Sequence, residues 1–388
     1  MDAKAAARAR AEQSRDALIG LSHRIHAHPE LAFEEERASA WVADALDEAG
    51  FAVTRGVGDL PTALLARAGS GPLHVAFLAE YDCLPGIGHA CGHNVIAAMA
   101  VGAALAAARV ADDVGLTVSL VGTPAEESGG GKVLLLERGV FDRVHAALMA
   151  HPAPVDSVTP PMLAWSHFEV SYAGKAAHAS AFPEQGVNAL DALTVAQTAI
   201  GLLRQHLRHG DRVHGIVTCG GSAPNVVPDR TTASYIVRAT TMEKLDGVRQ
   251  RVERCFEAGA LATGATLAMR ELSPRYADVR HDGELAALYQ RNAEAVGRRT
   301  MIPAALLERA AGSTDFGNVS QVLPGIHPVI GIDSLPAVNH QAEFAAHCAT
   351  AAADRAVMDG AVALAWTAID AAADETIAAR LRAGRAAS

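Results

Sequence analysis

The chain has 388 residues, of which 50% are hydrophobic and 20% are charged, and its formal net charge at pH 7 is −10. Disordered chains combine low hydrophobicity with high charge, while nucleic acids and anionic membranes attract basic proteins. The composition therefore predicts a folded protein with neither nucleic acid nor membrane as a partner. At roughly 100 to 200 residues per domain, the length predicts two domains.

The five cysteines form an odd and sparse set, which indicates free thiols in a reducing compartment rather than a disulfide framework. Residues 1–29 mix basic and acidic side chains and contain no apolar core of signal-peptide length. The longest stretch without charged residues or histidine, residues 94–108, is shorter than the ~20 residues that a membrane span needs. We therefore expect a cytoplasmic protein.

Residues 1–160 alternate between helical and strand-like patterns, which favours an α/β layer with a mostly parallel sheet. The strand-like runs are short and almost continuously apolar, as is typical of strands buried on both faces. The expected helices in this part are 3–27, 36–50 and about 95–109, and the expected strands are 73–79, 116–121 and 146–150.

A second pattern begins near residue 165 and has the order strand, helix, strand, strand, helix, strand, which is the split βαβ arrangement of ferredoxin-like domains. The expected strands are 167–173, 212–219, 231–240 and 265–271, and the expected helices are 188–207 and 242–262. A helix near 283–296 and a strand near 327–332 then resume the first pattern. The sequence therefore predicts a larger domain of residues 1–164 and 280–388, into which a smaller domain of residues 165–279 is inserted.

Residues that can bind metals or transfer protons follow several of the predicted strands. In open parallel sheets, ligands bind beyond the carboxyl ends of the strands, so these positions are expected to share one sheet edge. The residues at these positions carry thiol, imidazole or carboxylate groups, which are metal-ligand types: Glu80, Asp82, Cys91, His93, Glu126, Glu127, His151 and His340. Each alone has a simpler interpretation, as a solvated helix start, a small buried thiol or a hydrogen-bonded imidazole. Their coincidence at one edge favours a metal site.

Glu126 and Glu127 are neighbours that follow a proline, so their side chains are expected to point in different directions. One of them can bind a metal while the other faces the substrate. A metal lowers the pKa of a bound water towards ~7, and a neighbouring carboxylate can take the proton and pass it to a leaving amine. This spacing predicts metal-assisted hydrolysis of an acyl-nitrogen bond.

Seven short motifs occur in unbroken order between about residue 20 and residue 350. They are Ala90-Cys91-Gly92-His93-Asn94, Thr123-Pro124-Ala125-Glu126-Glu127, Ala150-His151-Pro152, Gly174-Lys175-Ala176-Ala177-His178-Ala179-Ser180, Pro224-Asn225-Val226-Val227-Pro228, Gly312-Ser313-Thr314-Asp315-Phe316-Gly317 and Asn339-His340. Together they resemble the dinuclear metallo-amidohydrolases related to aminoacylase and carboxypeptidase G. Within that superfamily, the chain is most similar to the branch of aminobenzoyl-glutamate hydrolase and the β-alanyl-lysine type dipeptidase.

The resemblance implies that two divalent metal ions are held at the sheet edge. The metal ligands that it implies are Cys91, His93, Glu127, His151 and His340, with Cys91 bridging the two ions. Glu126 is then the general base, and Asp82 orients the metal site from outside the ligand shell. A thiolate ligand favours zinc; manganese, cobalt and nickel are the other candidates.

The inserted domain corresponds in this resemblance to a lid and dimerisation domain, which implies a homodimer. His178 of the partner's lid would hydrogen-bond the oxyanion of the tetrahedral intermediate, while Asn225 and Arg238 would help to hold a substrate carboxylate or backbone. From the residues alone, His178 is interpreted as a surface loop residue, Arg238 as a salt-bridging residue on a strand, and Asn225 as a turn residue.

Two positions depart from the pattern of the superfamily. Many relatives have aspartate after the Cys-Gly-His triplet, where this chain has Asn94, as in the branch named above. More distant relatives place a ligand histidine two residues before the position of Asp82, where this chain has Glu80. The identity and the occupancy of the metal sites are therefore left open by the sequence.

The leading hypothesis is a metal-dependent hydrolase that cleaves the amide bond of a small dipeptide-like or N-acyl amino acid substrate. A second hypothesis is an amidase that uses Cys91 as a nucleophile with His93 or His151 as the base. A third is a protein that only binds a metal or a peptide, although such a protein would not need Glu126.

Overall fold

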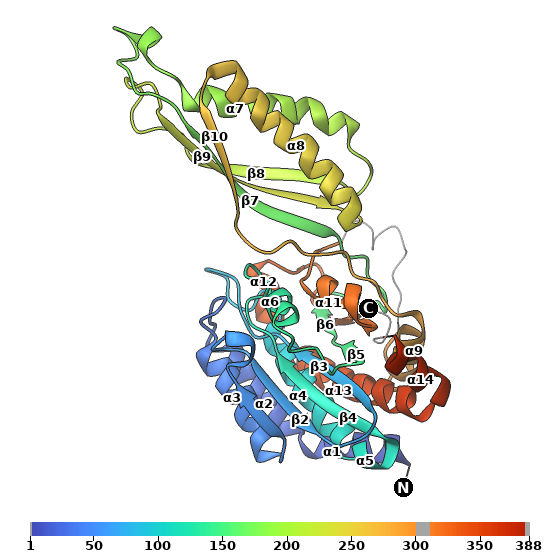
Figure 1. Cartoon of the computed structure of the whole chain (residues 1–388). Coiled ribbons are helices and arrows are strands. Elements are labelled where there is room, and N and C mark those ends of the chain that lie inside the picture. The colour runs from blue at the N-terminus through green and yellow to red at the C-terminus, as the bar shows by residue number, and fades with distance from the viewer. Residues whose placement is uncertain (1, 300–310, 385–388) are drawn as a thin grey trace. The chain divides into compact units, whose positions relative to one another are not determined.

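A computed structural model describes residues 2–299 and 311–384 of the chain. It divides into two compact units, Met1–Pro161 with Val279–Ser388, and Met162–Asp278. Figure 1 shows that the first unit combines the N-terminal and C-terminal parts of the chain, coloured blue to cyan and orange to red, while the second contains the green and yellow segments.

The first unit is built on a six-stranded sheet with the order β1-β2-β4-β3-β5-β11. The pairs β3–β4, β3–β5 and β5–β11 are parallel, while β1 and β2 are antiparallel additions at one edge. The strands are β1 (Ala52–Arg55), β2 (Leu64–Ala68), β3 (Leu73–Ala79), β4 (Leu116–Gly122), β5 (Ala146–Leu148) and β11 (Gly325–Ile326). This arrangement confirms the predicted α/β class with a mostly parallel sheet.

Apolar side chains cover both faces of this sheet, as the continuous apolar strands predict. Val75 and Phe77 of β3 pack into a core shared with helices α4 (His93–Ala108) and α13 (Ala351–Ala373). Ala76 and Leu78 face the opposite core, which includes α6 (Gly131–Glu137) and α11 (Phe316–Val322). Because β3 is buried at every position, its carboxyl end is a rigid platform for the residues that follow it.

The remaining helices of this unit surround the sheet: α1 (Ala3–Gln13), α2 (Arg15–His26), α3 (Glu36–Glu48), α5 (Ala111–Val114), α9 (Gly283–Ala295), α12 (Ala342–His347) and α14 (Glu375–Ala383). The alanines and Gly102 of α4 allow close contact with α13, since a Cβ added to Gly102 would lie 2.8 Å from the Cβ of Ala361. Helix α13 is long and apolar enough to cross a membrane, but 78% of its apolar window is buried inside the unit, as in the core helix of a globular protein.

Three predicted elements of the first unit are divided in the structure. The helix expected at 3–27 is interrupted at Ser14, whose backbone leaves the helical region between α1 and α2. The strand expected at 146–150 ends at Leu148 and is followed by β6 (His151–Ala153). The strand expected at 327–332 is replaced by β11 and by β12 (Val329–Gly331), which pairs with β6 in a separate parallel sheet.

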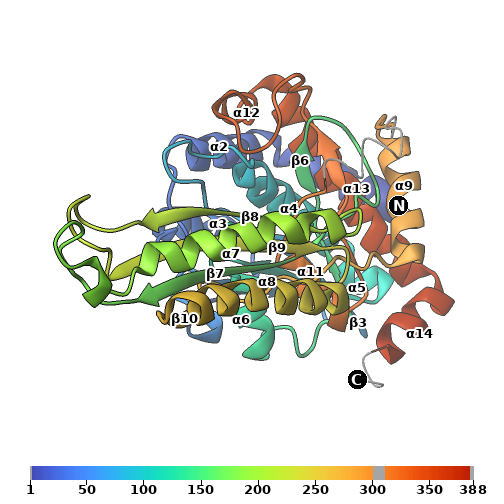
Figure 2. The ribbon, with the colours of Figure 1, turned by 90° about the horizontal axis from the view of Figure 1, so that it is seen from above.

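The second unit is a four-stranded antiparallel sheet with the order β10-β7-β9-β8 and two helices on one face. Its elements are β7 (Ala164–Ala173), α7 (Ala189–Leu203), β8 (Arg212–Cys219), β9 (Arg230–Ala239), α8 (Met242–Thr263) and β10 (Thr266–Glu271). Figure 2 shows α7 and α8 side by side over the strands. This is the predicted ferredoxin-like order. Phe168, Tyr172 and Phe256 form the centre of its core.

Candidate metal centre

The candidate metal centre lies beyond the carboxyl ends of β3 and β4, where β3 leads into Glu80 and Asp82. Helix α4 begins at His93, and Gly92 before it has the left-handed torsion φ 77°. A Cβ at Gly92 would lie 2.5 Å from Cγ of Pro152. Glycine is therefore required between Cys91 and His93, because only glycine combines this torsion with such a close approach.

Five predicted ligand residues converge on two overlapping groups of donor atoms. Cys91, His93 and His151 form one group, while Cys91, Glu127 and His340 form the other, with all donor atoms within 4.8 Å of one another in each group. The Sγ atom of Cys91 lies 3.4 Å from Nε2 of His151 and 3.5 Å from Nε2 of His340. Cys91 thus stands where a bridging ligand would stand.

These separations fit a divalent metal ion with tetrahedral geometry. For bond lengths of about 2.3 Å to sulfur and 2.0–2.1 Å to nitrogen or oxygen, two ligands of one ion lie roughly 3.4–3.6 Å apart. The two Cys91 distances match this value, as does the 3.5 Å between Nε2 of His340 and Oε2 of Glu127. In addition, Nε2 of His93 and Oε1 of Glu127 are buried without a hydrogen-bond partner. The donor set therefore fits two cations that share Cys91.

The surrounding hydrogen bonds point these donor atoms towards one another. Oδ1 of Asp82 lies 2.8 Å from Nδ1 of His93, and Oδ2 accepts a hydrogen bond of 3.0 Å from the backbone N–H of Glu127. Nδ1 of His151 lies 2.8 Å from the carbonyl oxygen of Pro152, which directs Nε2 towards Cys91. Partners of this kind set the tautomer and the orientation of metal-ligand imidazoles.

Burial makes the acidic groups of the cluster hard to ionise without added positive charge. Burial and the neighbouring Glu80 raise the pKa of Glu126, and burial raises the pKa of Glu127 and of the Cys91 thiol. Burial also lowers the pKa of His151 to about 4, so its imidazole is neutral near pH 7, the form that binds metals. Divalent cations would stabilise the ionised acidic groups in this site.

A buried ion triad adjoins the centre, and two of its members were assigned no role by the sequence analysis. Nζ of Lys132 lies 2.6 Å from Oε1 of Glu80 and 2.6 Å from Oδ1 of Asp315, and all three side chains are fully buried. A lysine within the apolar segment of α6 was the available signal, since lysine is almost never fully buried unless paired. Its partner Asp315 precedes α11, far away in the sequence.

The second unit brings two of its three predicted site residues together. His178 is exposed and forms an isolated β-bridge with Val226, and the N–H of Ala179 donates to the carbonyl oxygen of Asn225. Asn225 precedes β9, which begins at Arg230, whereas Arg238 lies near the end of this strand. The eight residues from Arg230 to Arg238 span roughly 26 Å at 3.3 Å per residue. Its guanidinium lies 5.4 Å from the centroid of the Trp165 ring. Arg238 is therefore separated from His178 and Asn225 within this chain.

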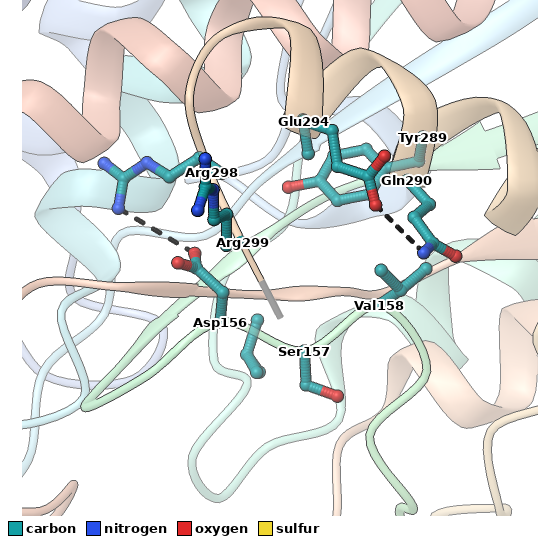
Figure 3. A pocket seen from close by; sticks show the side chains of 10 residues that line it. Asp156, Ser157, Val158, Tyr289, Gln290, Glu294, Arg298 and Arg299 are labelled. Carbon is teal, nitrogen blue, oxygen red and sulfur yellow. Dashed lines mark hydrogen bonds and ion pairs between the residues drawn. The ribbon is translucent and has the colours of Figure 1, made fainter. Parts of the chain in front are cut away.

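A separate pocket lies between α9 and residues 156–158 (Figure 3). Arg298 in its wall is paired with Asp359 at 2.9 Å and with Asp156 at 3.8 Å. Tyr289 and Gln290 of α9 also line it. Within the described part of the chain, this lining includes none of the candidate metal ligands, so the pocket is distinct from the metal centre.

Comparison with known proteins identifies both units. Residues 163–263 match the family model of the peptidase dimerisation domain. The chain is 40% identical to the Xaa-Arg dipeptidase of Mus musculus over 378 residues, which cover 93% of this chain and 87% of the relative. It is 36% identical to one of the polypeptides of the p-aminobenzoyl-glutamate hydrolase of Escherichia coli over 280 residues, or 67% of this chain and 58% of the relative.

Solved structures show the same fold. A dinuclear metal-binding peptidase of the M20 family from Bacillus subtilis superposes with a TM-score of 0.65 at 23% identity, covering 90% of this chain and 98% of that one. Fold, donor set and relatives together define a metal-dependent hydrolase of amide bonds in dipeptide-like or N-acyl amino acid substrates. The chain belongs to the M20 family of peptidases and amidohydrolases.

Proposed function

We propose that this enzyme is a dinuclear metallodipeptidase that removes a basic C-terminal residue from small dipeptides. The observation that carries the chemistry is the convergence of Cys91, His93, Glu127, His151 and His340 on two donor groups with the spacing of metal ligands. The substrate class is supported by the 40% identity with an Xaa-Arg dipeptidase over 93% of the chain. The net charge of −10 also favours encounter with cationic substrates.

In this proposal, the first ion is held by Cys91, His93 and His151, and the second by Cys91, Glu127 and His340. When bound, the ions polarise the scissile carbonyl and lower the pKa of the attacking water. The thiolate and imidazole donors favour zinc, and manganese is the next candidate. Asp82 keeps both His93 and Glu127 in place through its two oxygens.

Glu126 is the general base in this scheme. It neighbours the ligand Glu127, and its Oε2 lies 3.9 Å from Nε2 of His93, so its carboxylate lies at the edge of the donor cluster. From there it takes the proton of the attacking water at a carboxylate oxygen and delivers it to the leaving amine. Because the nitrogen receives this proton, it leaves as a neutral amine rather than as an amide anion.

We also propose that the enzyme acts as a homodimer assembled through the second unit. Among the described strands, β8 pairs only with β9, so it forms an edge of the sheet. It carries Ile216, which is 68% exposed. Leu202 on α7 is 72% exposed. An edge strand with exposed apolar side chains is a surface suited to pairing with a second copy. The match to a peptidase dimerisation domain supports this assignment.

His178 of the partner subunit would then stabilise the oxyanion, with Asn225 beside it on the substrate. Arg238 is remote from both residues in the same subunit. It would therefore contact the substrate from a different subunit than the His178 and Asn225 that act on the same substrate.

The free cysteines of the described structure are consistent with the proposed cytoplasmic location.

The alternative with Cys91 as a nucleophile is supported by the 3.4 Å between its Sγ atom and Nε2 of His151. A nucleophilic cysteine, however, needs a depressed pKa, whereas burial raises the pKa of Cys91. The position of Cys91 between two imidazoles and Glu127 fits a ligand better.

One experiment tests the proposal on purified enzyme. The metal is stripped with a chelator, zinc or manganese is added back, and kcat/KM is measured on Xaa-Arg, Xaa-Lys and Xaa-Glu dipeptides and on p-aminobenzoyl-glutamate. We expect turnover to vanish on stripping, to return with metal, and to be highest on the Xaa-Arg substrates. Undiminished turnover in the stripped enzyme would contradict the metal mechanism, and a preference for the glutamate substrates would contradict the basic specificity.

A further inference from the structure

The geometry points to Glu80 as a further metal ligand, one that completes the shell of the ion held by Cys91, His93 and His151 and leaves the other ion with the open position. This inference rests on the proposed dinuclear site and deepens it. It makes the two ions chemically different, because metal sites with four protein ligands are closed, while catalytic sites keep a position free for water or substrate.

The first support is the contact between Glu80 and His93. Oε2 of Glu80 lies 3.4 Å from Nε2 of His93, and both side chains are fully buried. When a metal ion binds Nε2 of His93, Nδ1 carries the proton that faces Asp82, so Nε2 and Oε2 of Glu80 are then two donor atoms that face each other. A cation between these two atoms would satisfy both of them. Neither of these two atoms has a hydrogen-bond partner.

The second support is the distance itself. Two ligands of one tetrahedral ion, each with a bond of about 2.0–2.1 Å, lie roughly 3.4 Å apart. The separation between Glu80 and His93 has this value, whereas the oxygens of Glu126 and Glu127 lie 3.9 and 3.8 Å from the same nitrogen. Glu80 also interacts electrostatically with the imidazole of His151, the other histidine of this group. Glu80 thus has the carboxylate oxygen nearest to Nε2 of His93, and it forms a third group of possible donors with His93 and Glu126.

The third support is the way in which Lys132 holds Glu80. The ammonium group binds Oε1 of Glu80 at 2.6 Å, which leaves Oε2 directed at the centre. Lys132 is itself fixed by Asp315, which binds its ammonium group at 2.6 Å and its backbone N–H at 2.8 Å. Within this buried triad, the one ammonium balances only one of the two carboxylate charges. A cation bound at Oε2 of Glu80 would balance the other.

Lys132 is therefore a positioning residue for the metal site. It holds Oε1 of Glu80, while Oε2 faces His93. The open coordination position then belongs to the ion of Cys91, Glu127 and His340.

The test compares the wild-type enzyme with Glu80→Gln and with the control Glu253→Gln, which removes a glutamate that is paired with Arg249 in the second unit. Zinc content is measured by mass spectrometry, and the two dissociation constants are measured by chelator competition. We expect two zinc ions in wild type and in the control. In Glu80→Gln, we expect the dissociation constant of one of the two ions to rise by more than roughly 100-fold. A rise of roughly 100-fold is the most that loss of a residue outside the ligand shell typically causes. Two ions bound by Glu80→Gln with unchanged affinity would overturn the inference.

A crystal structure of zinc-loaded wild type provides a test that does not depend on the folding of a variant. Anomalous scattering locates both ions, and we expect Oε2 of Glu80 at about 2.0–2.2 Å from the ion of Cys91, His93 and His151. An intervening water, with this oxygen beyond bonding distance of both ions, would overturn the inference and leave the proposed function intact. A wild-type enzyme that binds no metal would instead contradict the proposed function itself.

Discussion

Unusual backbone torsions direct several of the metal-centre residues. Ala125 and His340 adopt positive φ angles of 59° and 70°, although neither is glycine. The N–H of Ala125 donates to Oε1 of the buried Glu35, and the N–H of His340 donates to the carbonyl oxygen of Ala90. Such conformations cost of order 1–3 kcal/mol each and persist where the surroundings enforce them. Here they turn Glu126, Glu127 and the His340 imidazole towards the sheet edge.

The roles of the two adjacent glutamates can be separated by a pair of matched variants. We expect Glu126→Gln to retain both ions and to lose roughly 10²- to 10⁴-fold in kcat, because only the proton transfer is removed. Glu127→Gln should instead lose metal, since it removes a ligand. Metal content by mass spectrometry and kcat on an Xaa-Arg dipeptide distinguish the two. Near-normal turnover of Glu126→Gln would contradict the assignment of the base.

His74, at the opposite end of β3 from the metal centre, should make stability depend on pH. Burial, with Arg67 nearby, lowers its pKa from 6.5 to about 4, so the folded protein binds fewer protons than the unfolded chain between these values. The associated stability is complete above pH 6.5 and is lost as the pH falls through 4. It amounts to at most about 3 kcal/mol.

This dependence can be measured by urea unfolding of wild type and His74→Gln between pH 4 and pH 7.5. We expect the difference in unfolding free energy between the two proteins to shrink as the pH falls, because the variant has no proton to bind at this site. Replacement of the exposed His206 by glutamine is the control. Parallel pH profiles for wild type and His74→Gln would show that His74 does not titrate as expected.

Helix α8 offers two glycines that test how closely it packs on α7. A Cβ at Gly259 would overlap the carbonyl oxygen of Ala192 on α7, whereas a Cβ at Gly247 would have no neighbour within 4 Å. We expect Gly259→Ala to destabilise the protein by about 1–3 kcal/mol through overpacking. Gly247→Ala should stabilise it by roughly 0.5–1 kcal/mol, since alanine is the better helix former. Thermal unfolding of the full chain measures both, and equal effects would contradict this packing.

Elements with a strong apolar pattern were predictable, and those that depend on distant partners were not. The bounds of β3 and β8 agree with the sequence interpretation, because glycine and proline precede β3 and glycines flank β8. β1 and β2 were missed, since they are short and carry Arg55 and Arg67 among their few residues. The break at Ser14 involves neither proline nor glycine and left no local signal.

The same distinction holds at the metal centre. The rule that ligands gather at the carboxyl ends of parallel strands is enough to bring Cys91, Glu127 and His151 to one place. The pairing of Lys132 with Asp315 depends on α6 and α11 sharing one face of the sheet, a tertiary contact that no local pattern predicts. The separation of Arg238 from His178 likewise follows from strand register rather than from motif order.

At the scale of the whole molecule, action of His178 across the dimer can be tested with mixed subunits. A dimer of one Glu126→Gln subunit and one His178→Ala subunit has one complete site only if His178 acts on its partner. We expect such heterodimers, isolated through two different tags, to have about half of the wild-type kcat per dimer.

The control is a dimer of one wild-type subunit and one subunit that carries both changes. If His178 acts across the dimer, this control is inactive, because the intact Glu126 then faces a partner without His178. The reverse result, an active control and an inactive mixed dimer, would place His178 in its own subunit's site.

The order of the proposed ligands along the chain has a consequence for how the enzyme matures. Cys91, His93, Glu127 and His151 precede the second unit, whereas His340 follows it, and α13, which packs against the helix that begins at His93, comes later still. A ribosome must therefore translate beyond Ala373 before the last donor and its supporting helix are both available. Metal loading is then expected only after this point, and a product truncated before His340 would lack one of the proposed donors.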